Sequence, residues 1–412
     1  MKPTKPQSRK PKPQPSEKKA AVKDIYAARK RKKRRKVLQQ GIWLLLLAII
    51  ILILYQRRDS WIPKLETIGQ RHQSRHIESA AEDGKFPIWL YGDTSCQLGA
   101  AGGDLMLLTD SYLQVYEPDG SPVASRQHTY GNAMLQTAGG FAMVYESGGT
   151  HFRLETPSKT RFEKNMSDPI IFARLSPNGM TAVVTTAETC ACRLYVFNVK
   201  GQQIYERSCV ERLVDASFNA DETGCYAVSI HAADGGMKSV VHSYDFTMIN
   251  DVWTSQPLDT LAISVYNTSG GDVFLLGDTM CCYLTAAGTV RSSYTYSDKL
   301  ECGAFSGENA ALLFSNDEKR LKSLVLLDGT TNLPAVRVYD KDVMAIAMVP
   351  ESGAVLVQQR KQLETVAYSG TVLRTEAMAE SYEGFLRIGD HLYLRSYDHI
   401  DTMQYELIKS DK

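Results

Sequence analysis

Glycine-marked turns recur along the chain at a nearly constant interval, and this repeat restricts the possible folds more than any other feature of the 412 residues. One series begins with AAGGD at 100–104, ends with RIGD at 387–390, and has a mean spacing of about 41 residues. A second series lies about half a period away, as in FNVKGQQI at 197–204. Between the turns, short runs alternate Val, Ile, Leu, Tyr and Phe with polar residues, which is typical of β-strands. The C-terminal part of the chain is therefore predicted to be a repeated all-β structure.

A unit of about 40–50 residues with two turns fits a four-stranded antiparallel blade. One turn of each period would join the first two strands and the other would join the last two. A helical solenoid would instead show apolar residues at a 3.6-residue spacing. These features predict an all-β fold, a β-propeller over residues 86–412. A double β-sandwich is the alternative, because irregular spacing can imitate repetition.

The two ends of the repeat region predict how the ring closes. The last unit, from Gly384 onward, supplies three strands, whereas the strand FPIWLYG at 86–92 precedes the first full unit and has no partner. Pairing the early strand with the last unit would remove two exposed sheet edges. Seven full units and this composite give eight blades. Seven blades is the alternative, because the weak unit at 132–164 can be miscounted.

An apolar run at 41–55, GIWLLLLAIIILILY, contains no charged residue. With the residues before it, the run is long enough to cross the hydrocarbon layer at ~1.5 Å per residue, so residues 37–56 are predicted to form one transmembrane helix. Trp43 and Tyr55 lie near its ends, where amphipathic rings anchor in the headgroup layer. A cleaved signal peptide is the alternative. No small-x-small motif follows the run, which favours an uncleaved anchor.

Charge is divided sharply along the chain. Residues 1–36 hold 16 Lys/Arg and two acidic residues, whereas the rest holds 31 basic and 44 acidic residues. Basic flanks stay in the cytoplasm, so we expect a cytoplasmic N-terminus and an extracytoplasmic propeller, joined by a juxtamembrane linker at 57–85. The tail at 1–36 is too poor in apolar residues to fold and is predicted to be disordered. Its unbroken basic run is Arg29, Lys30, Arg31, Lys32, Lys33, Arg34, Arg35 and Lys36.

This basic run is expected to fix the topology or to contact anionic lipid headgroups at the cytoplasmic face. A nucleic-acid partner would require aromatic or base-reading residues among the cations, and only Tyr26 is near. The run therefore favours the membrane, rather than nucleic acid, as its partner.

Sequence motifs give no catalytic, cofactor-binding or metal-binding residue. HExxH, GxSxG, P-loop, EF-hand and paired CxxC patterns do not occur, and the eight His are scattered without ligand spacing. Propeller enzymes gather catalytic residues at the channel from different blades, so the spacing along the sequence leaves an enzyme open as an alternative.

All eight Cys lie after the predicted membrane helix, where an oxidising exterior would permit disulfides. If Lys200 and Gly201 form a two-residue hairpin turn, paired positions sum to 401 and Cys192 faces Cys209. We therefore predict a Cys192–Cys209 disulfide. Buried thiols that pack as small apolar residues are the alternative.

The repeat lines LSPNGMTAVV and LYVFNVKGQQIYE, together with a basic tail and one span, resemble a family of membrane-anchored, WD40-like or quinoprotein-like propellers of Gram-positive, clostridial-type bacteria, a domain family of unknown function. The Trp-Asp dipeptides of WD40 repeats and the Trp-rich signatures of quinone enzymes are absent, so no cofactor follows from the resemblance. We expect a non-enzymatic binding or scaffold module of the cell envelope that holds a protein or a cell-wall polymer. The alternative is an extracytoplasmic hydrolase or lyase with its site in the central channel.

Overall fold

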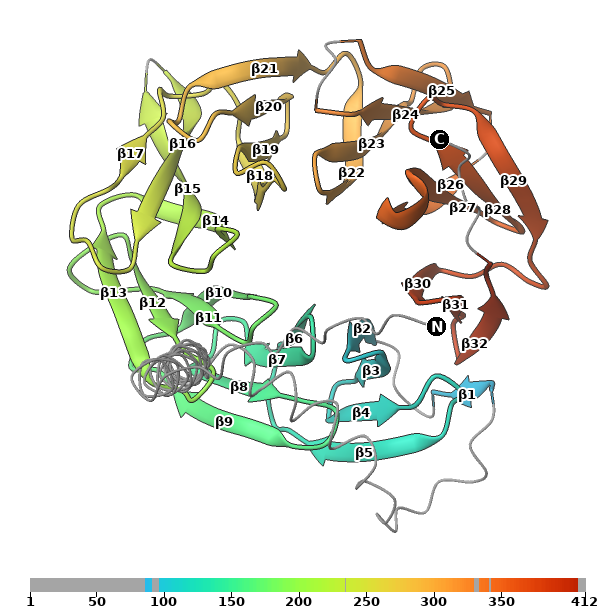
Figure 1. Ribbon diagram of the computed structural model, residues 1–412, viewed down its shortest axis with the longest axis horizontal. Coiled ribbons are helices and arrows are strands. Elements are labelled where there is room, and N and C mark those ends of the chain that lie inside the picture. Colours follow the sequence, from blue (N-terminus) through green and yellow to red (C-terminus); the bar gives the residue numbers. More distant parts are fainter. Residues whose placement is uncertain (1–85, 91–95, 234, 330–332, 341, 407–412) are drawn as a thin grey trace, which may run out of the picture. The chain divides into compact units, whose positions relative to one another are not determined.

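The computed structural model describes residues 86–90, 96–233, 235–329, 333–340 and 342–406. They form eight four-stranded antiparallel sheets that follow one another around a ring (Figure 1). The predicted all-β propeller with eight blades is thus confirmed, and the seven-blade and β-sandwich alternatives are wrong. The tail at 1–36, the membrane helix at 37–56 and the linker at 57–85 lie outside the described residues. In the part that is described, no helix has the length and apolar character needed to cross a bilayer.

Blades are numbered here from the first complete sheet. Blade 1 contains β2 (Gln97–Ala101), β3 (Asp104–Leu108), β4 (Tyr112–Tyr116) and β5 (Pro122–Gln127). Blade 2 contains β6 (Ala133–Ala138), β7 (Phe141–Glu146), β8 (His151–Glu155) and β9 (Thr160–Asn165). Blade 3 contains β10 (Ile170–Leu175), β11 (Thr181–Thr185), β12 (Cys192–Phe197) and β13 (Gln203–Cys209). Blade 4 contains β14 (Arg212–Phe218), β15 (Gly224–Ala233), β16 (Gly236–Asp245) and β17 (Trp253–Thr254).

The second half of the ring repeats this plan. Blade 5 contains β18 (Ala262–Asn267), β19 (Val273–Gly277), β20 (Met280–Leu284) and β21 (Val290–Thr295). Blade 6 contains β22 (Lys299–Ser306), β23 (Asn309–Asn316), β24 (Leu321–Leu327) and β25 (Ala335–Tyr339). Blade 7 contains β26 (Val343–Val349), the 3₁₀ turn η1 (Pro350–Ser352), β27 (Ala354–Gln359), β28 (Gln362–Ala367) and β29 (Val372–Ala377). Blade 8 contains β30 (Gly384–Ile388), β31 (His391–Arg395), β32 (His399–Gln404) and β1 (Ile88–Trp89).

Burial follows the position of a strand within its blade. The first strand lies innermost around the ring and the fourth lies outermost (Figure 1). Second strands such as β3 (DLMLL) are buried at every position, because they are flanked by strands in their own sheet and by blades on both faces. The outermost strand β29 instead alternates half-buried and exposed residues. The alternation of more buried and more exposed side chains along a strand is therefore clear only in the outermost strands.

Both glycine series fall where the repeat predicts. Gly179 lies between the first two strands of blade 3 and Gly201 lies between the last two, with φ of 84° and 77°. Glycine reaches this left-handed region without the steric cost that a Cβ imposes. In an antiparallel sheet these two turns lie at the same end, which we call the turn face.

Ring closure joins segments about 310 residues apart in sequence. Ile88 pairs with Ile400 and Trp89 with His399, so β1 forms the outermost strand of blade 8 as predicted. Blade 8 also bonds to blade 1, because the Tyr393 hydroxyl donates to the Pro118 carbonyl at 3.1 Å.

Replacing Ile88 by Ala should test this closure. Ile88 is 8% exposed and packs with Tyr393, Ile400 and Leu105, so we expect Ile88→Ala to lower the free energy of unfolding by about 2–4 kcal/mol. Urea denaturation would measure the loss. Ile249→Ala, at a residue 91% exposed, is the matched control and should change stability by less than about 0.5 kcal/mol. Equal losses would contradict a closing role for β1.

The same seam should respond to pH. The His399 ring lies 5.1 Å from that of Trp89, its Nδ1 is 2.7 Å from Asp398, and its Nε2 is 3.5 Å from both Glu380 and Asp401. Burial lowers the pKa of His399, but the Asp398 hydrogen bond and the nearby carboxylates outweigh it and raise the pKa above its usual value.

The resulting stabilisation is complete below the pKa of an unfolded histidine, about 6.5, and is lost as pH rises through the higher folded pKa. We therefore expect the stability difference between the protein and His399→Gln to shrink from pH 6 to pH 9, as followed by urea denaturation. A difference that stays constant or grows would contradict this account.

Candidate functional site

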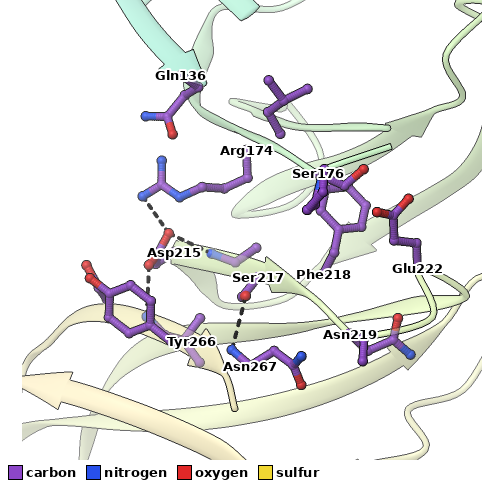
Figure 2. A pocket seen from close by; sticks show the side chains of 16 residues that line it. Gln136, Arg174, Ser176, Asp215, Ser217, Phe218, Asn219, Glu222, Tyr266 and Asn267 are labelled. Atoms are coloured by element: carbon purple, nitrogen blue, oxygen red, sulfur yellow. Dashed lines mark hydrogen bonds and ion pairs between the residues drawn. The ribbon is translucent and has the colours of Figure 1, made fainter. Parts of the chain in front are cut away.

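A pocket opens among the inner strands of blades 2 to 5 on the channel side of the ring. It encloses about 510 Å³. Its walls come from β6, β10, β14 and β18 and from two turns of the turn face (Figure 2). The lining residues are Gln136, Arg174, Leu175, Ser176, Pro177, Asp215, Ala216, Ser217, Phe218, Asn219, Ala220, Glu222, Ser264, Val265, Tyr266 and Asn267.

An ion pair crosses the seam between blades 3 and 4 inside the pocket. Arg174 Nη2 lies 2.5 Å from Asp215 Oδ1, and the Arg174 Nη1 group donates to the Ala173 carbonyl at 3.0 Å. Asp215 is 2% exposed and also accepts hydrogen bonds from the backbone N–H groups of Ala216 and Val265, each at 2.8 Å. Burial raises the pKa of Asp215, and Arg174 and the two amides act against that rise. The pair is satisfied internally and adds no net charge to the pocket.

Local strand geometry explains the position of Asp215. The pairing of β14 with β15 shifts between Leu213 and Asp215, so Val214 is an extra residue in a β-bulge. Bulges redirect the side chains that follow them. Asp215 consequently bonds to the backbone of β18 on one side and to Arg174 of β10 on the other.

Two amide side chains supply hydrogen-bonding capacity that the protein leaves unused. Asn267 donates its backbone N–H to Ser217 Oγ at 3.2 Å, but its buried side-chain Oδ1 has no partner. In Figure 2 the side-chain amide of Gln136 points toward the guanidinium group of Arg174, in the same pocket. Buried polar atoms are rarely left unpaired, so the Asn267 oxygen is an exception in the wall of this pocket.

The rim of the pocket contains a residue with an unusual backbone conformation. Glu222 has a φ of 58°, in the left-handed region that non-glycine residues seldom adopt. Its Oε1 accepts hydrogen bonds from the backbone N–H of Asn178 at 3.2 Å and from Asn178 Nδ2 at 2.9 Å. Asn178 belongs to blade 3 and Glu222 to blade 4, so this contact joins the two turns above the ion pair.

An aromatic wall completes the pocket. The Tyr266 ring stacks on Phe305 with centroids 5.0 Å apart and an interplanar angle of 26°. Burial raises the pKa of Tyr266, so its phenol stays protonated at neutral pH. The pocket thus offers amides, hydroxyls, one rim carboxylate and a neutral phenol. These groups suit the hydrogen-bonded recognition of a polar ligand.

The residues predicted from sequence have different outcomes. Trp43, Tyr55 and the basic run Arg29–Lys36 lie outside the described residues. Cys192 does pair directly with Cys209, so the predicted register is confirmed, while the disulfide itself stays a prediction. Across the described ranges, no cluster of His, Cys, Asp and Glu could hold a metal ion.

The predicted two-residue turn at Lys200 and Gly201, from which this register follows, is wrong. Asn198 accepts a hydrogen bond from Gly201 N–H at 2.8 Å, and Phe197 pairs with Gln203, so three residues form the turn and paired positions sum to 400 there. A bulge between Phe197 and Val196 then restores the sum of 401. The two departures cancel before the strand reaches Cys192.

A Ser–His–Asp hydrogen-bond chain in blade 4 was not visible in the sequence. Ser229 Oγ lies 2.9 Å from His242 Nε2, and His242 Nδ1 lies 2.8 Å from Asp251 Oδ2. Ser229 is fully buried and its hydroxyl also donates to Glu211 Oε2 at 2.5 Å. A nucleophilic serine needs an approach for substrate, so this geometry describes a structural polar network between strands.

The fold and the pocket define a class: an eight-bladed β-propeller with a polar pocket among its inner strands. The chain belongs to a family of unknown function, DUF5711, which it matches over residues 93–404. No curated protein matches its sequence. Many solved structures are similar in fold, and two of them each match 78% of this chain.

One of these structures is BamB from Moraxella catarrhalis, with 12% identity, a TM-score of 0.51 and 99% of that chain covered. The other is Sqt1 from Chaetomium thermophilum bound to the N-terminus of the ribosomal protein L10, with 14% identity, a TM-score of 0.56 and 100% of that chain covered. At these identities the likeness extends to the fold alone.

Removing the Asp215 carboxylate should destabilise the protein strongly. Asp215→Ala leaves Arg174 and the Val265 N–H without their partner, and we expect a loss of about 3 kcal/mol in the free energy of unfolding. Asp259→Ala is the control, because the Asp259 side chain is 82% exposed although it pairs with Lys238 at 3.1 Å. Its loss should stay within about 0.5 kcal/mol in the same urea titration. Similar losses would show that the seam does not depend on Asp215.

Proposed function

We propose that this protein is a membrane-anchored, extracytoplasmic binding module of the cell envelope, in which the pocket holds a polar segment of a protein partner. The pocket carries this proposal, because it combines a volume of about 510 Å³ with the amide of Gln136, which faces Arg174 in it. The rigid inner strands supply the frame and the turns supply the variable contacts.

The chemistry of the lining favours a neutral or weakly basic polar segment. Arg174 is neutralised by Asp215, so the pocket has no spare cation for an acidic ligand. Gln136 and Asn267 can donate to and accept from peptide amides. That a propeller of similar fold is bound to a polypeptide N-terminus in the Sqt1 structure supports a protein as the occupant.

Photocrosslinking should identify the partner. With a benzophenone side chain at position 136, irradiation of intact membranes should give one dominant protein adduct, identified by mass spectrometry. In crosslinked pull-downs of the tagged protein, the double variant Gln136→Ala, Asn267→Ala should retain less than about a tenth of that partner. Gln256→Ala, an exposed amide, should retain all of it, and a benzophenone at Tyr397, 73% exposed, should give no such adduct. An adduct with cell-wall polymer and with no protein would contradict the proposed protein partner and would identify the polymer as the ligand.

The proposed anchoring follows from the apolar run at 41–55 and the basic flank before it. Ser369 is exposed in the β28–β29 turn. In cells that carry Ser369→Cys or Ser8→Cys, a membrane-impermeant maleimide should label the first variant in intact cells and the second only after the membrane is permeabilised. The unmodified protein, whose cysteines are buried or half-buried, sets the background. The reverse pattern would invert the topology.

A further inference from the structure

Three thiols gather at the end of blade 3 opposite the turn face. Cys192 begins β12 and Cys209 ends β13, directly opposite each other in the ladder. They are 0% and 6% exposed and belong to the core cluster between blades 3 and 4. Cys190 precedes them in the β11–β12 loop, is half-buried, and bonds through Sγ to the Cys192 carbonyl at 3.3 Å.

The surroundings of Cys192 and Cys209 make the two thiols unequal. A hydrogen bond from Cys209 is the main effect that lowers the pKa of Cys192, and the N–H of Leu213, 3.3 Å from Cys192 Sγ, acts in the same direction. The same contact and burial raise the pKa of Cys209. Because the thiolate is the nucleophile in disulfide exchange, the Leu213 N–H, which favours the Cys192 thiolate, prepares Cys192 for attack.

We propose that Cys192 and Cys209 are an oxidisable dithiol that closes as a cross-strand disulfide, and that Cys190 is the half-exposed thiol through which a disulfide oxidant enters. The Cα atoms of directly opposed antiparallel residues lie about 4.5–5.5 Å apart, which is within the range that a disulfide spans. Cys225 packs in the same cluster, is buried like Cys192, and has a pKa that burial raises to about 12. It is therefore an unreactive reference.

The exchange balances without a metal or cofactor. The Cys190 thiolate attacks a disulfide RSSR, releases one RS⁻, and forms a mixed disulfide. The Cys192 thiolate then attacks the Cys190 sulfur and releases the second RS⁻, and the Cys209 thiolate attacks Cys192 and releases Cys190. Two protein thiols are oxidised, RSSR is reduced to two RSH, and the two protons from the protein pass to the released thiolates.

Oxidation of the purified full-length protein by oxidised glutathione tests the chemistry, independently of where the propeller resides. After reduction and removal of the reductant, the oxidant should lower the number of cysteines alkylated in denaturant from eight to six, and peptide mapping should show Cys192 linked to Cys209. Cys190→Ser should slow bridge formation on the order of tenfold but leave the final linkage unchanged. Cys225→Ser, in the same core, should oxidise at the unmodified rate.

Alkylation of all eight cysteines after oxidant treatment would overturn the proposal, as would a dominant bridge between another pair. An unchanged rate in Cys190→Ser would overturn its entry role. A second measurement uses the unmodified protein and needs no substitution in the core. Oxidation should raise the midpoint temperature of its thermal unfolding, and a reductant should return that temperature to its original value. The oxidation state in cells rests on the proposed extracytoplasmic placement, so a bridge that forms in vitro but is reduced in cells would contradict that placement and leave the dithiol chemistry intact.

Discussion

Burial on both faces is the constraint on which this structure depends. Each blade covers its neighbours, and second strands such as β3 have no solvent-facing side. A blade at an open end would expose one apolar face to water, so closure of the ring stabilises the arrangement. Closure rests on a short strand, because in the described part of the chain the register with β32 consists of Ile88 and Trp89, followed by the Leu90 N–H bond to the Asp398 carbonyl. At this seam Ile88, Tyr393 and Ile400 pack together with Leu105 and Leu107 of blade 1.

The seams between inner strands differ around the ring, and this difference creates the pocket. Between blades 1 and 2, Gln97 bonds to both the Ala133 carbonyl and the Leu135 N–H. Between blades 4 and 5, Asp215 and Ser217 accept the N–H groups of Val265 and Asn267. These side chains form hydrogen bonds that join one inner strand to the inner strand of the next blade. Between blades 3 and 4, side chains that extend from a strand and a turn of blade 3 make the contacts instead, from Arg174 to Asp215 and from Asn178 to Glu222.

The blade count and the order of the strands could be predicted because tight turns with a positive φ favour glycine for a local steric reason, so glycines mark the turns in the sequence. Gly179 and Gly201 mark turns whatever the rest of the chain does. The closing strand was also predictable, since an unpaired strand before the first unit and a missing strand in the last leave one economical solution. Turn spacing and the alternation of apolar residues are enough to predict both features.

The pocket could not be predicted in this way, because its residues come together through tertiary geometry. Arg174, Asp215 and Val265 lie roughly forty to fifty residues apart and belong to no motif. Asp215 in particular is placed by the bulge at Val214, and bulges leave no mark in turn spacing. The Cys192–Cys209 register shows the same limit, since it emerged correctly only because the three-residue turn and the bulge offset each other.

The thiols and the pocket meet in one strand. The Leu213 N–H that bonds to Cys192 and the Asp215 carboxylate that bonds to Arg174 lie on either side of the bulge in β14. Any change in the position of the Cys192 sulfur therefore acts on the backbone at Leu213, two residues from the ion pair. Since a bulge is a point where strand pairing is already interrupted, β14 can adjust there more readily than elsewhere.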